Sequence, residues 1–269
     1  MGKLEKKWAF KIVYDDDALI VVDKLAGLLV VPTPRDEKHT LDNLVNQALK
    51  TKGPGPNAYP AHRLDRDTSG LVIFAKGKSM LANLVEQFKK HIVQKTYLAI
   101  VQGRVKSQKG EINILLATDR KTYAVYPTSD KKIGQPALTR FQVLSYLRGS
   151  TLLEVEPKTG RTNQIRVHLA YIGHPLVGER KYAIAKDFSV KFRRTALHAE
   201  TISFRHPVTK KMLFFETPLP DDMKNFIQAH HIPGINDHLK NTKGLVKEKW
   251  KGHGKYIEKE REKTPANRS

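Results

Sequence analysis

The chain has 269 residues, of which 39% are hydrophobic and 28% are charged. This composition suits one catalytic domain with some additional tail, and no run is apolar and long enough to span a bilayer. The 48 lysines and arginines outweigh 27 acidic residues and leave a net charge of +21. Such an excess predicts a polyanionic partner, and nucleic acid is favoured over a membrane because the basic regions lack a helix with a one-sided apolar face.

The absence of cysteine excludes disulfides and thiolate metal sites. The 11 histidines are scattered, and none pair at the spacing of a zinc-binding helix, so we expect no metal. Residues 1–7 are basic, but residues 8–13 form too short an apolar segment for a signal peptide. We therefore expect a cytoplasmic protein with no membrane association.

The first third of the chain predicts strands followed by a helix. Residues 10–14 and 19–23 are β-type runs that flank three aspartates, which indicates a hairpin. The apolar residues 28–31 predict a strand that ends at Pro32. Thr40 is the expected N-cap of a helix whose apolar face consists of Leu41, Leu44, Val45, Ala48 and Leu49.

A polar cluster at residues 61–70 runs directly into the apolar residues 71–75, which predict a strand buried on both faces. Two interpretations are open from these residues alone. Asp65 and Asp67 could serve as turn residues that bond nearby backbone amides, with solvated arginines around them. Alternatively, one aspartate is held at the strand edge beside Arg63, deprotonated as a nucleophile or base requires.

The remaining elements indicate an antiparallel sheet. A helix with Leu84 and Phe88 on its apolar face precedes a strand at residues 94–101, in which Tyr97 covers the pleated surface. Strands at residues 136–146 and 151–157 form a hairpin around Gly149. Consecutive hairpins favour antiparallel pairing over alternating strand and helix units.

A short helix follows, with Thr162 as a possible cap and a buried face that contains Ile165 and Leu169. Arg166 lies on a different face of this helix, so periodicity alone predicts a solvated side chain. Two more strands and a last helix around Phe226 complete the globular part. His198 and His206 in this part are expected to be hydrogen-bonded structural histidines, although a catalytic role is open.

Three segments resemble the RluA-type pseudouridine synthases. Residues 62–70 match the signature His-Arg-Leu-Asp, two free positions, then Thr-Ser-Gly. Residues 95–99 resemble the family's Lys-x-Tyr-x-Ala segment, and residues 159–168 resemble Thr-Gly-Arg-x-His-Gln-Ile-Arg-x-His, with Asn163 where histidine is common. The resemblance extends over roughly residues 10–230.

This resemblance implies an α+β fold with a mixed, mainly antiparallel central sheet, flanking helices and a basic RNA-binding cleft. It implies that Asp65 is the catalytic carboxylate, that Tyr97 stacks on the target base and that Arg166 pairs with Asp65. Arg63 is implied to enter the space left by a flipped uridine. The expected RNA contacts are made by His62, Arg63, Lys95 and Arg161, and the reaction requires no cofactor.

The implied function is isomerisation of uridine to pseudouridine in structured RNA, ribosomal RNA first and transfer RNA second. Asp65 could attack C1′ or remove a proton from C2′. A catalytically silent RNA-binding protein and a nucleoside glycosidase are the competing hypotheses. We expect a monomer whose catalytic domain is residues 1–231, without a separate N-terminal RNA-binding module. Residues 232–269 form a basic tail, expected to be flexible and to contact phosphates or to act only as a solubilising segment.

Overall fold

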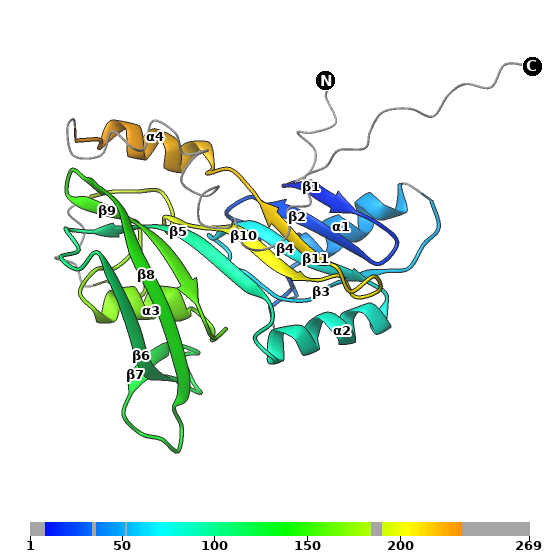
Figure 1. Cartoon of the computed structure of the whole chain (residues 1–269), viewed down its shortest axis with the longest axis horizontal. Coiled ribbons are helices and arrows are strands. Elements are labelled where there is room, and N and C mark those ends of the chain that lie inside the picture. The colour runs from blue at the N-terminus through cyan, green and yellow to red at the C-terminus, as the bar shows by residue number, and fades with distance from the viewer. Residues whose placement is uncertain (1–8, 34–35, 52, 184–189, 233–269) are drawn as a thin grey trace, which may run out of the picture.

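The computed structural model describes residues 9–33, 36–51, 53–183 and 190–232. Within these residues, eleven strands form one sheet, flanked by four helices (Figure 1). The strands are β1 (Phe10–Asp15), β2 (Leu19–Lys24), β3 (Ala58–Pro60), β4 (Ser69–Lys76), β5 (Gln94–Gln102), β6 (Lys109–Thr118), β7 (Val125–Thr128), β8 (Gln135–Leu147), β9 (Ser150–Pro157), β10 (Leu197–Arg205) and β11 (Met212–Glu216). The helices are α1 (Leu41–Lys50), α2 (Lys78–Lys89), α3 (Gln164–Tyr171) and α4 (Asp221–Ala229).

The sheet runs in the order β1-β2-β4-β10-β5-β9-β8-β6-β7, with β3 added to β4 and β11 added to β10. The pair β4 and β10 is parallel, and the other named strand pairs are antiparallel. The predicted α+β architecture with a mixed, mainly antiparallel sheet is therefore confirmed. In Figure 1, β5 and β10 lie between one group of elements that contains α1 and α2 and another that contains α3.

Alternating side chains of the central strands enter different parts of the core, because neighbours along a strand point to opposite faces. In β4, Val72 and Phe74 pack in the same cluster as α1, whereas Leu71 and Ile73 pack in the cluster that contains α2. The prediction that this strand is buried on both faces is confirmed. In β5, Tyr97 belongs to the cluster of α1 and α3 and is only 8% exposed.

The helix at Leu41 begins as predicted, with the Thr40 hydroxyl accepting a hydrogen bond from the Asn43 amide. The strand predicted at residues 28–31 is absent, and only an isolated bridge joins Leu29 to Thr40. The carbonyls of Leu29 and Val30 accept hydrogen bonds from the first amides of α1, at 2.8 and 3.0 Å. These carbonyls therefore satisfy a helix end, which apolar periodicity does not reveal.

The predicted Thr162 cap of α3 is also wrong. Asn163 occupies the N-cap position in the left-handed conformation, and its side chain makes no capping bond. The turn is held instead by Gln164, whose Oε1 accepts from the Arg161 amide at 2.9 Å and whose Nε2 donates to Leu138 O at 3.0 Å. A buried amide therefore takes over the stabilisation that we assigned to the threonine.

The two predicted structural histidines are hydrogen-bonded and do not line the site described below. His198 Nδ1 lies 2.9 Å from Ser69 Oγ, and His206 Nε2 lies 2.8 Å from Asp16 Oδ2. Among the described helices, none is long and apolar enough to cross a membrane. The basic tail lies almost entirely beyond the described residues, which end at residue 232.

Gly70 makes the parallel contact between β4 and β10 possible. It pairs with Ala199, and its φ of +116° is a conformation that L side chains rarely adopt. A Cβ at this position would lie 2.2 Å from Ala199 O and 2.7 Å from Ala199 N. The glycine of the signature is therefore needed so that the two backbones can approach each other.

We expect Gly70→Ala to lower the free energy of unfolding by at least about 4 kcal/mol, because backbone strain is combined with a clash against backbone atoms. Gly77→Ala is the matched control, since Gly77 has a φ of +91° but open space around its missing Cβ. Its expected cost is only about 1–3 kcal/mol. Urea unfolding followed by circular dichroism measures both values, and equal losses would contradict the role of the Ala199 contact.

Candidate active site

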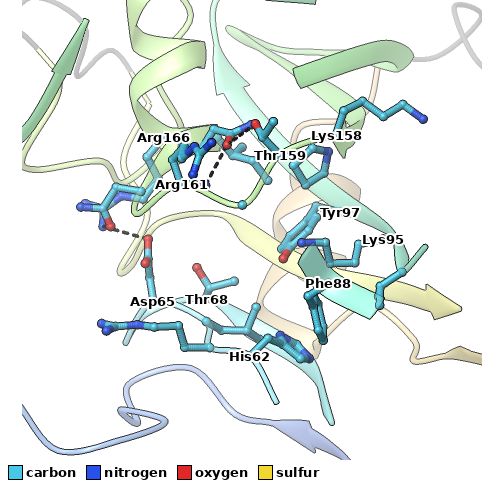
Figure 2. Close-up of a pocket in the computed structure, with 18 of the residues that line it drawn as sticks. His62, Asp65, Thr68, Phe88, Lys95, Tyr97, Lys158, Thr159, Arg161 and Arg166 are labelled. Atoms are coloured by element: carbon cyan, nitrogen blue, oxygen red, sulfur yellow. Dashed lines mark hydrogen bonds and ion pairs between the residues drawn. The ribbon is translucent and has the colours of Figure 1, made fainter. Parts of the chain in front are cut away.

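A cavity of about 560 Å³ opens where the signature segment, the end of α2, β5 and the β9–α3 turn meet (Figure 2). All seven residues predicted for catalysis or RNA contact line this cavity, although they come from three separate stretches of the chain: His62, Arg63, Asp65, Lys95, Tyr97, Arg161 and Arg166. Arg63 and Arg161 are exposed at its rim. The sequence segments that resemble one family therefore converge on one site.

The loop around Asp65 is held by its backbone carbonyls. The fully buried Lys24 donates from Nζ to Arg66 O at 3.1 Å and to Leu28 O at 2.8 Å. At the next residue, Arg194 Nη1 donates to Asp67 O at 3.1 Å. These bonds use the main chain of the two free positions of the signature, so the side chains there need not be specified.

Arg166 forms an ion pair with Asp65 across the cavity wall. Its Nη1 donates to Asp65 Oδ2 at 3.2 Å, and the arginine side chain is only 16% exposed. The solvated arginine that helix periodicity predicts is thus wrong, whereas the pairing implied by the family resemblance is present. The reason is tertiary, because Asp65 lies on a segment 101 residues away.

Glu179 holds the other side of the Arg166 guanidinium. Its fully buried carboxylate accepts two hydrogen bonds from Arg166, from Nε at 2.7 Å and from Nη2 at 2.8 Å. Its Oε1 also accepts from the backbone amides of Lys181 at 2.8 Å and Arg180 at 3.0 Å. We did not predict this residue, since a glutamate just after a glycine turn carries no sequence signal of burial.

The two buried partners determine each other's protonation. Burial alone would lower the pKa of Arg166, but the hydrogen bonds and charge of Glu179, with a contribution from Asp65, raise it. Burial alone would raise the pKa of Glu179, but Arg166 and the neighbouring amides lower it below its usual range. Arg166 is therefore a permanent cation fixed beside Asp65.

Asn163 occupies the position where the family commonly has histidine. Its Nδ2 donates to the Tyr182 hydroxyl at 2.7 Å, and its Oδ1 accepts from Arg166 Nη1 at 3.4 Å. The Arg166 guanidinium carbon also lies 5.2 Å from the centre of the Tyr182 ring. The amide thus supplies a donor and an acceptor at this position, and Tyr182 is a further contact that sequence reasoning missed.

The opposite wall is aromatic. Figure 2 shows Asp65 and Arg166 on one side of the cavity and Tyr97, Lys95 and Phe88 on the other. Burial, and then the charge of Asp65, raises the pKa of the Tyr97 hydroxyl, which therefore stays protonated. Phe88 packs against the core as the apolar face of α2 predicts, but it also lines the cavity, and its ring centre lies 4.9 Å from that of His62.

His62 is tied to the protein at one ring nitrogen. Its Nε2 accepts a hydrogen bond from the Ile73 amide at 3.1 Å. Burial, and then the charge of Lys95, lowers the pKa of His62 to about 3, so the ring is neutral. In the described part of the chain, no group of three or more histidine or acidic side chains is arranged to hold a metal ion.

Comparisons with known proteins agree with this architecture. The family model for RNA pseudouridylate synthases matches residues 18–171. A solved structure, human RNA pseudouridylate synthase domain containing 4, superposes with a TM-score of 0.69 at 23% identity and covers 82% of this chain and 94% of that one. The fold is therefore that of the pseudouridine synthases.

Curated relatives show which type of pseudouridine synthase this chain is similar to. The uncharacterized RNA pseudouridine synthase YhcT of Bacillus subtilis is 36% identical over 81% of this chain and 72% of its own length. The dual-specificity RNA pseudouridine synthase RluA of Pasteurella multocida is 36% identical over 77% of this chain and 92% of its own length. The ribosomal large subunit pseudouridine synthase D of Nitrosomonas europaea is 38% identical over 81% of this chain and 64% of its own length. This chain belongs to the RluA-type pseudouridine synthases, which are RNA-modifying isomerases.

We expect Glu179→Gln to reduce both stability and turnover, because it leaves the buried Arg166 without its two-point anionic partner. The unfolding free energy should fall by about 3 kcal/mol at pH 7. Since the folded-state pKa of Glu179 is depressed, this difference should be complete above the usual pKa of 4.5 and shrink as the pH falls below it. Turnover should fall about tenfold or more, because Asp65 loses a fixed counter-charge.

Glu111→Gln is the matched control, since Glu111 also pairs with an arginine, Arg140, but at an exposed site. The unfolding free energy and the single-turnover rate of this variant should both stay close to those of wild type, as measured by denaturant unfolding and single-turnover kinetics. A Glu179→Gln enzyme with lower stability but wild-type turnover would show that Glu179 supports only the fold.

Proposed function

We propose that this chain isomerises uridine to pseudouridine in structured RNA, with Asp65 as the reacting carboxylate. Ribosomal RNA is the first candidate substrate. The observation that carries the proposal is the Asp65–Arg166 pair facing Tyr97 across one cavity. The net charge of +21 supports a polyanionic substrate.

In the proposed reaction, the two walls of the cavity have different roles. The bond from ribose C1′ to uracil N1 breaks, the base turns, and C1′ joins C5, which loses its proton while N1 gains one. Asp65 acts at the ribose, either by attack on C1′ or by removal of a C2′ proton, and Arg166 supplies its counter-charge. Tyr97 offers a ring on which a flipped base can stack, because stacking retains a base without demanding sequence.

The names of the relatives support RNA of the ribosome as the first candidate. One relative is named for the ribosomal large subunit and another for dual specificity. Transfer RNA is the second candidate, as the family resemblance of the sequence implies. Exposed Arg63 and Arg161 at the cavity rim are suited to contact RNA around the target nucleotide. Arg63 is the proposed occupant of the space that the flipped uridine leaves.

Two alternatives from other classes are separable by experiment. A silent RNA-binding protein would not need an acid, its buried counter-charge and an aromatic wall in one cavity. A nucleoside glycosidase would use Asp65 but release free uracil. The proposed synthase leaves pseudouridine in the RNA, whereas a silent binder leaves uridine and a glycosidase leaves an abasic site, so product analysis of the RNA distinguishes it from both.

The proposal includes the expected domain organisation and setting. Residues 1–231 are proposed to contain the catalytic domain, and the protein is proposed to act as a cytoplasmic monomer. The basic residues after Ile232 add RNA affinity through phosphate contacts.

We expect Asp65→Ala to lower turnover by at least about 10³-fold while RNA binding stays nearly intact, because only the reacting group is removed. Tritium release from RNA labelled at uracil C5 measures the reaction, with ribosomal and transfer RNA transcripts as substrates. Arg166→Ala should also lose most activity. Asp67→Ala is the matched control, since Asp67 is exposed and contributes its backbone carbonyl to the loop. Tritium release by Asp65→Ala at a rate close to wild type would refute the assignment.

The basic tail is expected to contribute to RNA binding. Removing residues 233–269 should weaken RNA binding and flatten its dependence on salt, because each lost phosphate contact reduces the number of released counterions. Filter binding at several salt concentrations gives this slope for the full chain and the truncated chain. An identical slope would favour the alternative of a purely solubilising tail.

A further inference from the structure

Lys95 lines the cavity beside Tyr97, and the proposed mechanism does not use its charge. It lies two residues before Tyr97 in β5, so both side chains leave the same face of the strand. Its Nζ is 5.6 Å from the centre of the Phe88 ring and 4.0 Å from the point that a Cβ on Gly160 would occupy. The amine therefore sits between α2 and the β9–α3 turn, at the far side of the cavity from Asp65 (Figure 2).

The Lys95 amine is not neutralised by the protein. In the described part of the chain it has no carboxylate within 4 Å and no hydrogen-bond acceptor. Lys158, at the β9–α3 turn, is by contrast paired with Glu156. Burial alone accounts for the lowered pKa of Lys95, whereas the charge of Asp65 acts on Tyr97. The amine is thus a donor that faces the cavity with its hydrogen-bonding capacity unused.

The positions of the two carbonyl groups on uracil show which atom would lie next to the Lys95 amine. If C1′ lies at Asp65, the base extends from there along Tyr97 toward Lys95. The ring atom opposite N1 is C4, which carries O4, and the ring atom opposite C5 is C2, which carries O2. Turning the base about its N3–C6 axis exchanges N1 with C5 and C4 with C2. A carbonyl oxygen therefore occupies the far end of the base both before and after the turn.

We propose that the Lys95 ammonium donates a hydrogen bond to this far carbonyl oxygen, O4 in uridine and O2 in the turned base. When the C1′–N1 bond breaks with its electron pair on the base, the negative charge spreads from N1 onto both carbonyl oxygens. A cation at the far end stabilises that anion in either orientation. Lys95 keeps its proton throughout, so it is a catalytic electrostatic group and not the base at C5. This inference rests on the proposed function.

The same contact selects uracil over cytosine. Cytosine carries an amino group at C4, and an amino group donates hydrogen bonds as an ammonium does. Two donors would face each other in a site with little water, which is a repulsive contact. Lys95 would thus reject cytidine before any bond is broken, without reading the surrounding sequence.

The groups around Lys95 determine whether a pH profile of the reaction can report the titration of its amine. Tyr97 on β5 and Phe88 on α2 are uncharged, and His62 in the signature segment is neutral with a pKa of about 3. Lys158 and Arg161 on the β9–α3 turn, together with Arg63, are cations that also line the cavity, as do Lys89 and His91 at the end of α2. The pKa of Lys95 is lowered to about 8 by burial. Because the ammonium is the active form, kcat/KM should fall as the pH rises through about 8.

The first experiment measures tritium release by wild type, Lys95→Ala and Lys95→Arg between pH 6 and 10. Lys95→Ala should lose about 10- to 100-fold in single-turnover rate at saturating RNA, the usual effect of a charge-assisted hydrogen bond, with little change in RNA affinity. Lys95→Arg should recover part of this rate and show no decline near pH 8, because a guanidinium stays charged. Lys50→Met, at the exposed end of α1, is the control for general loss of charge.

Chemical rescue tests the charge without relying on a second side chain. Propylammonium should restore activity to Lys95→Ala by occupying the space of the missing side chain, and neutral propanol should not. A Lys95→Ala enzyme with wild-type single-turnover rates but weaker RNA affinity would overturn the proposal, since Lys95 would then be a phosphate contact. A decline near pH 8 that persists in Lys95→Arg would overturn it as well.

Substitution of the target uridine by 4-thiouridine tests the contact with the base. Sulfur is a weak acceptor, so wild type should slow on this substrate, whereas Lys95→Ala should slow no further. Equal slowing of both enzymes would contradict the contact. Wild type that releases no tritium from any RNA would instead count against the proposed function itself, and Asp65→Ala provides the zero level of the assay.

Discussion

The site depends on one buried cation that two carboxylates share. Arg166 is fixed on one side by the fully buried Glu179 and offers its remaining Nη1 to the more exposed Asp65. Burying an arginine is costly unless its charge is compensated, and Glu179, held by backbone amides, provides that compensation inside the protein. Asp65 is therefore free to act in the proposed chemistry while its counter-charge stays in place.

The position of this ion pair follows from the sheet. The parallel contact of β4 with β10 joins the two groups of elements seen in Figure 1, and Gly70 allows it by letting the backbones approach. Asp65 lies just before β4, and Arg166 lies on α3, which packs over β9 and β8. A change in the β4–β10 approach would thus alter the geometry between the acid and its counter-charge.

Opposite sides of the cavity carry groups of opposite charge. The Asp65 carboxylate lies on one side, and the uncompensated Lys95 amine lies on the other side together with the Tyr97 ring. In the proposed reaction, an anion acts at the ribose while a cation faces the part of the base that becomes negative. Because burial excludes water from this wall, each charge acts on the base more strongly than it would at an exposed surface.

The sequence predicted most of the secondary-structure elements and several of the residues that line the cavity. A continuous apolar run predicted β4, helical spacing predicted α1 and α2, and the resemblance to one family implied the site residues Asp65, Tyr97 and Arg166. Apolar periodicity failed at residues 28–31 and at Thr162, because the bonds there are made with α1 and with Gln164. Only the tertiary structure decided that Glu179 is buried against Arg166 and that Phe88 shares a cavity with Asp65. Those facts depend on contacts between distant segments, and no local spacing encodes them.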